Sequence, residues 1–157
     1  MAEADPAVNR LRREIRDLVG ADTIEVGHSL DTALQIRRRL AENSIVAILM
    51  DRHIGRDRVS VQFLGRRTWF LRTPALMAFM TGRRCAMLSR ARRSGAVQSL
   101  RGVPIEVRRD RPRDEAIQAA AQEFANQLGA RVREHPEYWY HFYRYWDAQA
   151  DTPDQPL

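Results

Sequence analysis

The sequence predicts an α/β fold in which a mixed, mostly parallel sheet is flanked by helices. The first observation is the continuous apolar run over residues 45–50, because a run of this length fits a strand that is buried on both faces. The second is a predicted strand over 23–26, followed by a helix from residue 30. Strand, helix and strand in this order form a βαβ unit with parallel strands and a right-handed crossover.

Capping signals place the first two helices. Asp5-Pro6 is typical of an N-cap followed by proline in the first helical turn. Apolar residues then recur at helical spacing, as Val8, Leu11, Ile15 and Leu18. Gly20 ends this helix, and Ser29 is expected to cap the second one.

The middle of the chain predicts further strands and a third helix. Apolar and polar residues alternate over 59–63, which is typical of a half-buried strand. Gly65-Arg66-Arg67 is expected to turn the chain, and Thr73-Pro74 to begin a helix that stops at Gly82. The remaining predictions are strands over 85–88 and 103–107, with a hairpin turn over 90–95.

A long helix is expected over 113–133, with an inward face made of Ile117, Ala121, Phe124, Leu128 and Val132. His135-Pro136 breaks it. Residues 137–146 follow, and seven of these ten are aromatic. Either they form a short helix packed through Trp139, Phe142, Tyr143 and Trp146, or their rings lie in a lipid headgroup layer. The whole is expected to be one domain over residues 1–147, with a flexible tail over 148–157.

Composition limits the possible partners. A chain of 157 residues with 44% hydrophobic and 29% charged residues is typical of a folded protein. All 26 basic residues are arginine, and the net charge of +6 predicts attraction to nucleic acid, phospholipid headgroups or acyl-carrier proteins. Cys85 is the single cysteine, which excludes an intramolecular disulfide. No apolar stretch approaches the roughly 18 residues of a membrane span, and the N-terminus lacks a signal-peptide pattern.

The candidate site begins where the apolar run ends, because ligands of α/β sheets bind outside the carboxyl ends of strands. The charged residues there are Asp51, Arg52, His53, Arg56 and Arg58. A solvated loop is the alternative interpretation. His53 and Asp57 have the residue types of a general base and its orienting carboxylate, but a loop gives their spacing no fixed geometry. No metal-ligand spacing, phosphate-binding glycine loop or dinucleotide fingerprint occurs, and no cofactor is expected.

Three motifs in series resemble a known family. They are Val46-Ala47-Ile48-Leu49-Met50-Asp51 with its arginine-rich loop, Val59-Ser60-Val61-Gln62-Phe63-Leu64-Gly65-Arg66 leading to Thr73-Pro74-Ala75-Leu76, and His135-Pro136-Glu137-Tyr138-Trp139-Tyr140 with Phe142-Tyr143-Arg144-Tyr145-Trp146. Their order over about 110 residues is similar to the bacterial lipid A biosynthesis (lauroyl/myristoyl) acyltransferases of the lysophospholipid acyltransferase superfamily.

The resemblance implies transfer of a fatty acyl chain from acyl-carrier protein or coenzyme A to a hydroxyl of an anionic glycolipid. It further implies a peripheral position at the cytoplasmic face of the membrane. Residues that would line the substrate site are Asp51, Arg52, Arg56, Arg58, Gly65 and Arg66, whose arginines would bind phosphate of donor or acceptor. Nucleic acid is not an expected partner, because arginine is scattered over every predicted element.

The sequence departs from the family at the catalytic motif, His-x-x-x-x-Asp/Glu. His28 is followed five residues later by Ala33, and His53 by Arg58, so no catalytic base is assigned. The expectation is that the chain corresponds to the C-terminal half of a family member, without its N-terminal part. It is then either a fragment or a shortened relative that has lost the chemistry. The alternative is a non-catalytic basic module that binds an anionic lipid, acyl-carrier protein or a catalytic partner.

Overall fold

The computed structural model describes residues 6–24, 30–93, 96–141 and 145–146, with the backbone alone at 30, 89–93 and 96–102. The chain divides into two compact units, Met1–Val46 and Ala47–Leu157. The predicted single domain over 1–147 stays a prediction, and the predicted tail over 148–157 lies outside the described residues.

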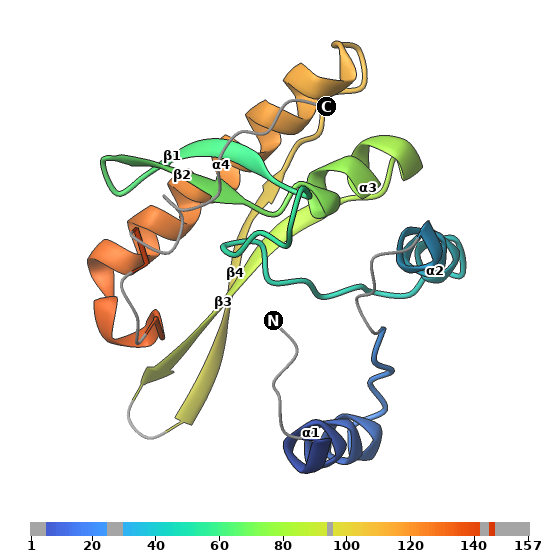
Figure 1. The fold of residues 1–157 in the computed structure, drawn as a ribbon. Coiled ribbons are helices and arrows are strands. Elements are labelled where there is room, and N and C mark those ends of the chain that lie inside the picture. Colours follow the sequence, from blue (N-terminus) through green and yellow to red (C-terminus); the bar gives the residue numbers. More distant parts are fainter. Residues whose placement is uncertain (1–5, 25–29, 94–95, 142–144, 147–157) are drawn as a thin grey trace. The chain divides into compact units, whose positions relative to one another are not determined.

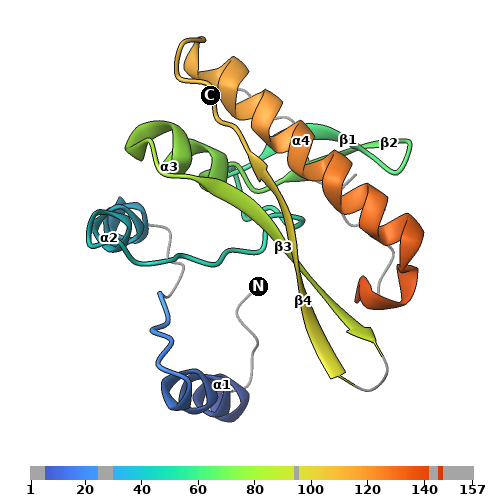
Figure 2. The ribbon, with the colours of Figure 1, turned by 180° about the vertical axis from the view of Figure 1, so that it is seen from behind.

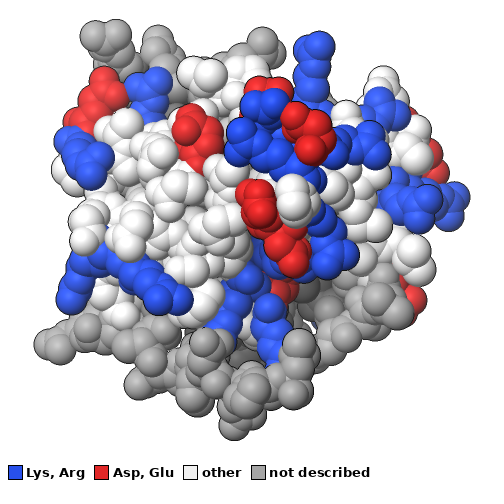
Figure 3. Space-filling model, turned by 90° about the horizontal axis from the view of Figure 1, so that it is seen from above, with Lys and Arg blue, Asp and Glu red and all other residues white. Residues whose placement is uncertain are grey.

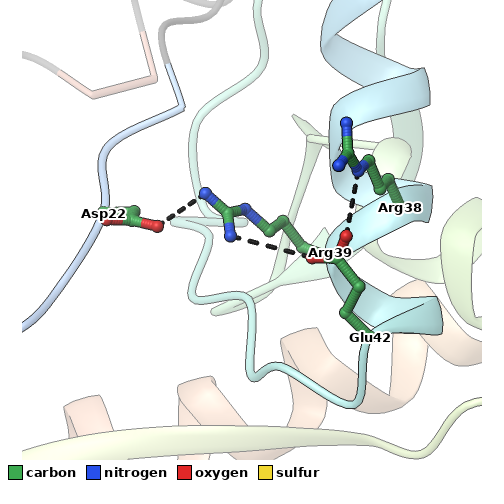
Figure 4. Close-up of polar contacts among 4 residues, drawn as sticks. All are labelled: Asp22, Arg38, Arg39 and Glu42. Atoms are coloured by element: carbon green, nitrogen blue, oxygen red, sulfur yellow. Dashed lines mark hydrogen bonds and ion pairs between the residues drawn. The ribbon is translucent and has the colours of Figure 1, made fainter.

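The first unit contains the two predicted helices, α1 (Pro6–Leu18) and α2 (Leu30–Ala41). The predicted strand over 23–26 is not formed at residues 23 and 24, and its remainder lies outside the described residues, as does the Ser29 cap. One ion pair joins α2 to the segment before it, since Arg39 donates to Asp22 at 2.6 Å; at the end of α2, Arg38 Nε donates to Glu42 at 2.9 Å (Figure 4).

The second unit contains two antiparallel hairpins and two helices (Figures 1 and 2). The first hairpin pairs β1 (Val59–Phe63) with β2 (Arg66–Phe70). The second pairs β3 (Cys85–Arg93) with β4 (Ala96–Ile105). The helices are α3 (Thr73–Thr81) and α4 (Arg113–Glu134), and a short 3-10 turn, η1 (Pro136–Tyr138), follows α4. The α/β class is compatible with this arrangement, but the predicted mostly parallel sheet is not, because both described pairs are antiparallel.

The predicted strand over 45–50 is wrong. The segment is extended and its exposure alternates, with Met50 buried but the side chains of Ile45 and Leu49 94% and 74% exposed. Among the described residues no strand lies beside it, and its one ladder-like bond runs from the Leu71 amide to the Met50 carbonyl at 2.9 Å. The apolar run predicted that both faces of the segment are buried, but in the structure only one of its two faces is covered.

The turn of the first hairpin is tighter than predicted. Leu64 and Gly65 both have positive φ, 51° and 84°, which is the pattern of a two-residue turn matched to the twist of the strands. Arg66 and Arg67, predicted to lie in the turn, are the first residues of β2 instead. The second hairpin is also longer than predicted, since residues 90–93 continue β3.

Helix α4 organises the second unit. It packs against β1, α3, both strands of the second hairpin and η1. Its buried face carries many small residues, namely Ala116, Ala120, Ala121, Ala125 and Gly129, beside Ile117 and Val132. Small side chains let the helix approach the strands closely, and the predicted inward residues Ile117, Ala121 and Val132 are confirmed as buried.

Glutamines of α4 also satisfy the backbone along the outer edge of β1. The Gln122 side chain accepts from the Gln62 amide and donates to the Gln62 carbonyl, both at 2.9 Å. Gln118 Nε2 donates to the Ser60 carbonyl at 2.5 Å. Because an edge strand otherwise presents unpaired amides and carbonyls, these contacts position the helix along the hairpin.

Candidate functional site

Asp51 binds three aromatic-run residues that lie about ninety positions away in the chain. Its Oδ2 accepts hydrogen bonds from Trp139 Nε1 at 3.1 Å and from His141 Nε2 at 2.8 Å. Its backbone carbonyl accepts from the Tyr145 hydroxyl at 2.8 Å. The side chains of His141 and Asp51 are 4% and 16% exposed. Because Trp139 can only donate, Oδ2 acts as an acceptor, and the His141 Nε2 atom carries the proton.

The rings around Asp51 belong to the core. Phe63 lies 5.3 Å from Trp139 and 5.9 Å from Trp146, measured between ring centroids. The Arg66 guanidinium lies 5.6 Å from the centroid of Trp146. The prediction that the aromatic run packs against the core is therefore confirmed for Trp139 and Trp146. The predicted helix is not formed at residues 139–141, and Phe142 and Tyr143 lie outside the described residues.

A carboxylate that accepts from an imidazole is the arrangement of a general base and its orienting group. Here the imidazole is almost wholly buried and ringed by Trp139 and Tyr145, at centroid distances of 4.4 and 4.9 Å. A substrate hydroxyl cannot reach it in this conformation. We therefore assign the cluster of Asp51, Trp139, His141 and Tyr145 a structural role, that of holding the C-terminal segment against the end of the apolar run.

A second cluster lies on the other face of the first hairpin. Alternation along the strands brings Arg58, Ser60, Gln62, Arg67 and Trp69 to this face, which we call the Trp69 face. The guanidinium carbons of Arg58 and Arg67 lie 4.5 and 5.5 Å from the centre of the Trp69 ring. Arg67 Nε also donates to the Ser60 hydroxyl at 2.8 Å. Two cations thus share one indole, on a face whose five residues include no acidic side chain.

The predicted site residues fall into separate places. Arg58 lies on the Trp69 face, whereas Asp51 and Arg66 lie with the buried aromatic rings on the opposite side of the hairpin. Arg52 and Arg56 are exposed in the loop before β1. Gly65 occupies the turn, where its positive φ explains the residue without any ligand.

Among the described contacts His53 and Asp57 do not bond each other, and the Asp57 carboxylate accepts a hydrogen bond from the Thr73 hydroxyl. His53 is half-buried in the same loop. Burial, and secondarily the charge of Arg58, lower its pKa from the usual value. A base with a lowered pKa is a weak proton acceptor, and no carboxylate orients it in the described residues.

Charge alone does not single out the Trp69 face. In Figure 3 many arginines lie against acidic side chains, and ion pairs join Arg72 to Asp114 and Arg108 to Asp110, both at 2.7 Å. The stacking on Trp69 is the distinguishing feature. In the described part of the chain, no three His, Cys, Asp or Glu side chains gather to hold a metal, and no helix has the length and apolarity to cross a membrane.

Three important residues escaped prediction from the sequence. His141 stands in a run whose sequence signal is its aromatic rings, and the sequence places Arg67 in a predicted turn and Trp69 in no predicted element. The sequence does carry a signal for Arg67 and Trp69, because they are two positions apart, as Ser60 and Gln62 are. A second strand after the Gly65 turn places Arg67 and Trp69 on the same face of the hairpin as Ser60 and Gln62.

Comparison with known proteins gives one finding. The family model described as bacterial lipid A biosynthesis acyltransferase matches residues 1–148 of the chain. No protein of curated function matches significantly.

Proposed function

The chain belongs to the bacterial lipid A biosynthesis acyltransferase family, and from this premise we propose that it binds the substrates of an acyl transfer to a glycolipid. The acyl donor is acyl-carrier protein or coenzyme A, and the acceptor is a hydroxyl of an anionic glycolipid. The reaction takes place at the cytoplasmic face of the membrane, where the chain is peripheral.

The observation that carries the proposal is the Trp69 face. Arginine offers a planar fork that binds phosphate through two parallel hydrogen bonds. Stacking of Arg58 and Arg67 on one ring restricts both side chains, so less freedom is lost when an anion binds. We assign the phosphate of the donor or the acceptor to this face.

This assignment changes the predicted site. Arg58 is retained, and Arg67 and Trp69 join it. On the opposite face Asp51 binds the buried aromatic rings, the exposed Arg66 lies over Trp146, and Gly65 shapes the turn. The exposed Arg52 and Arg56 precede β1 in the same loop as Arg58, and we propose that they extend the basic rim.

Binding of a water-soluble, deacylated lipid A precursor without membranes tests the Trp69 face. Arg58→Gln together with Arg67→Gln should weaken the affinity at least about tenfold, because each charged hydrogen-bond donor contributes about 1.5–3 kcal/mol. The matched control is Arg83→Gln with Arg84→Gln, two exposed arginines between α3 and β3. Titration calorimetry at low salt measures both. Equal affinities for the two double variants contradict the assignment.

A non-catalytic binding module is the second candidate, and a specific observation favours it. None of the four histidines is followed five residues later by Asp or Glu, and His141 is bound to Asp51 inside the core. On this alternative the purified chain shows no acyl transfer from acyl-coenzyme A to a lipid A precursor. Turnover that His53→Ala abolishes would instead identify His53 as the base.

A further inference from the structure

Helix α1 has an apolar face that no other described residue of the first unit buries. Val8, Leu11, Ile15 and Leu18 are three or four positions apart, so they share one face of the helix. No residue of α1 is buried. Leu11, Ile15 and Leu18 are 56%, 54% and 85% exposed, and Val19, directly after the helix, is 75% exposed. We call these five residues the α1 stripe.

Arginines border one edge of the α1 stripe. Arg12 and Arg16 each follow a stripe residue and lie along that edge, while Glu14 lies at the other edge and Arg10 farther round on the polar face. The helix carries four arginines against two acidic residues. An apolar stripe on a helix with an excess of arginine is the pattern of a helix that lies in the headgroup layer of an anionic membrane. Arginine can place its charge at the phosphates while its stem stays with the apolar side chains.

We infer that α1 docks the protein on the surface of an anionic phospholipid bilayer, with the α1 stripe in the headgroup layer. Its 13 residues extend about 20 Å, which is shorter than the roughly 30 Å hydrocarbon core of a bilayer. The helix therefore lies along the surface. This inference rests on the proposed function, since a protein that binds a membrane glycolipid must meet the bilayer, and it names the element that makes the contact.

A second copy of the chain is the competing occupant, because the stripe also has heptad spacing. Val8 and Ile15 take position a, and Leu11 and Leu18 take position d, which favours two-stranded coiled coils. The helix is however only two heptads long, fewer than a stable coiled coil needs. In a parallel pair Glu14 would face Val19, and Arg12 would face Ala7, so no ion pair joins the edges. Charge complementarity therefore favours the anionic bilayer.

Cosedimentation of the full chain with vesicles tests the inference. The vesicles contain phosphatidylglycerol with phosphatidylcholine, or phosphatidylcholine alone, and no glycolipid. We expect binding to the anionic vesicles that weakens with salt. Leu11→Ser with Ile15→Ser should lower the partition coefficient at least about tenfold. The control, Leu34→Ser with Met80→Ser, removes side chains of closely matched exposure, 58% and 53%, and should retain binding.

Charge is tested separately. Arg12→Gln with Arg16→Gln should lower binding to the anionic vesicles about tenfold or more, whereas Arg83→Gln with Arg84→Gln, which removes the same charge elsewhere, should lower it less than about threefold. Equal losses for variant and control overturn the inference, as does a wild-type chain that ignores anionic vesicles. Light scattering measures the oligomeric state. If the wild-type chain is a dimer and Leu11→Ser with Ile15→Ser makes it a monomer, the inference of membrane docking is overturned, and the stripe binds a second copy.

A larger fall in melting temperature for the stripe variant than for Leu34→Ser with Met80→Ser also overturns the inference, because the stripe then packs within the chain. A failure of the membrane-docking inference can be told apart from a failure of the phosphate-binding assignment to the Trp69 face. The vesicles contain no glycolipid, and the binding of the deacylated precursor involves no membrane.

Discussion

The carboxylate of Asp51 accepts a hydrogen bond from the His141 imidazole at 2.8 Å, across ninety positions of the chain. The same oxygen accepts from Trp139. Two donors thus depend on one carboxylate in a largely buried place, and this side chain joins the C-terminal segment to the end of the apolar run beside the Tyr145 bond to the Asp51 backbone carbonyl.

Asp51→Asn should lower the free energy of unfolding by about 1–3 kcal/mol, because a neutral amide oxygen is a weaker acceptor for both donors than the carboxylate that it replaces. The matched control is Asp114→Asn. Asp114 is 74% exposed and paired to Arg72, so this change should lower the free energy of unfolding less than Asp51→Asn does. Urea unfolding measures both. Similar losses for the two variants would show that the Asp51 cluster does not anchor the segment.

The pKa of His53 is lowered by burial and by Arg58, and this predicts a pH dependence of stability. The unfolded chain binds a proton near pH 6.5, and the folded chain binds it at lower pH. The folded state therefore loses stability as the pH falls below about 6.5, until the folded group also protonates.

His53→Gln should remove this contribution. Above pH 7.5 the difference in unfolding free energy between wild type and His53→Gln should be constant, and below about pH 6.5 it should change in favour of the variant. Urea unfolding at a series of pH values gives the difference curve. A difference that stays constant down to pH 5 contradicts the lowered pKa.

The sequence predicts local structure well wherever one signal decides it. Helix α3 is framed by Thr73-Pro74 and by Gly82, whose φ of 67° closes the helix as expected. Helix α4 has inward positions whose apolar period is unambiguous. These predictions depend on residues close together in the chain, so that no distant contact has to be known.

Prediction fails where the outcome depends on a partner segment. The apolar run over 45–50 indicates a strand, but whether it joins a sheet depends on a neighbour that its own residues do not specify. The same applies to Asp51: its position at the end of the run is visible in the sequence, whereas its partner His141 is set by the path of the chain after Pro136. The common position of Arg58 and Arg67 at the Trp69 ring likewise depends on the register of the first hairpin, which the local sequence does not specify.

The glutamines of α4 offer a prediction about that hairpin. Gln122→Ala removes both hydrogen bonds to the Gln62 backbone and uncovers the edge of β1. We expect a loss of about 1–2 kcal/mol in unfolding free energy. Amide hydrogen exchange at Gln62 should accelerate by more than the global loss requires, because this amide loses its own acceptor.

Gln127→Ala is the control on the same helix. Gln127 bonds only the side chain of Glu123 among the described contacts, and its Oε1 is buried without a partner. Its removal should therefore cost less than Gln122→Ala and leave exchange at Gln62 unchanged. If Gln127→Ala accelerates that exchange equally, the effect belongs to the helix as a whole.

Two glycines of opposite character give the last prediction. At Gly129, inside α4, an added Cβ meets Phe63 and Arg133 at an ordinary 3.7 Å, so alanine fits and removes the entropic cost of glycine in a helix. Gly129→Ala should raise the unfolding free energy by about 0.5–1 kcal/mol. At Gly65 an added Cβ meets nothing, but φ is +84°, and Gly65→Ala should lower stability by about 1–2 kcal/mol through backbone strain alone. Thermal melts separate the two directions. If Gly65→Ala instead leaves stability unchanged and weakens binding of the deacylated precursor, Gly65 belongs to the substrate site rather than to the turn.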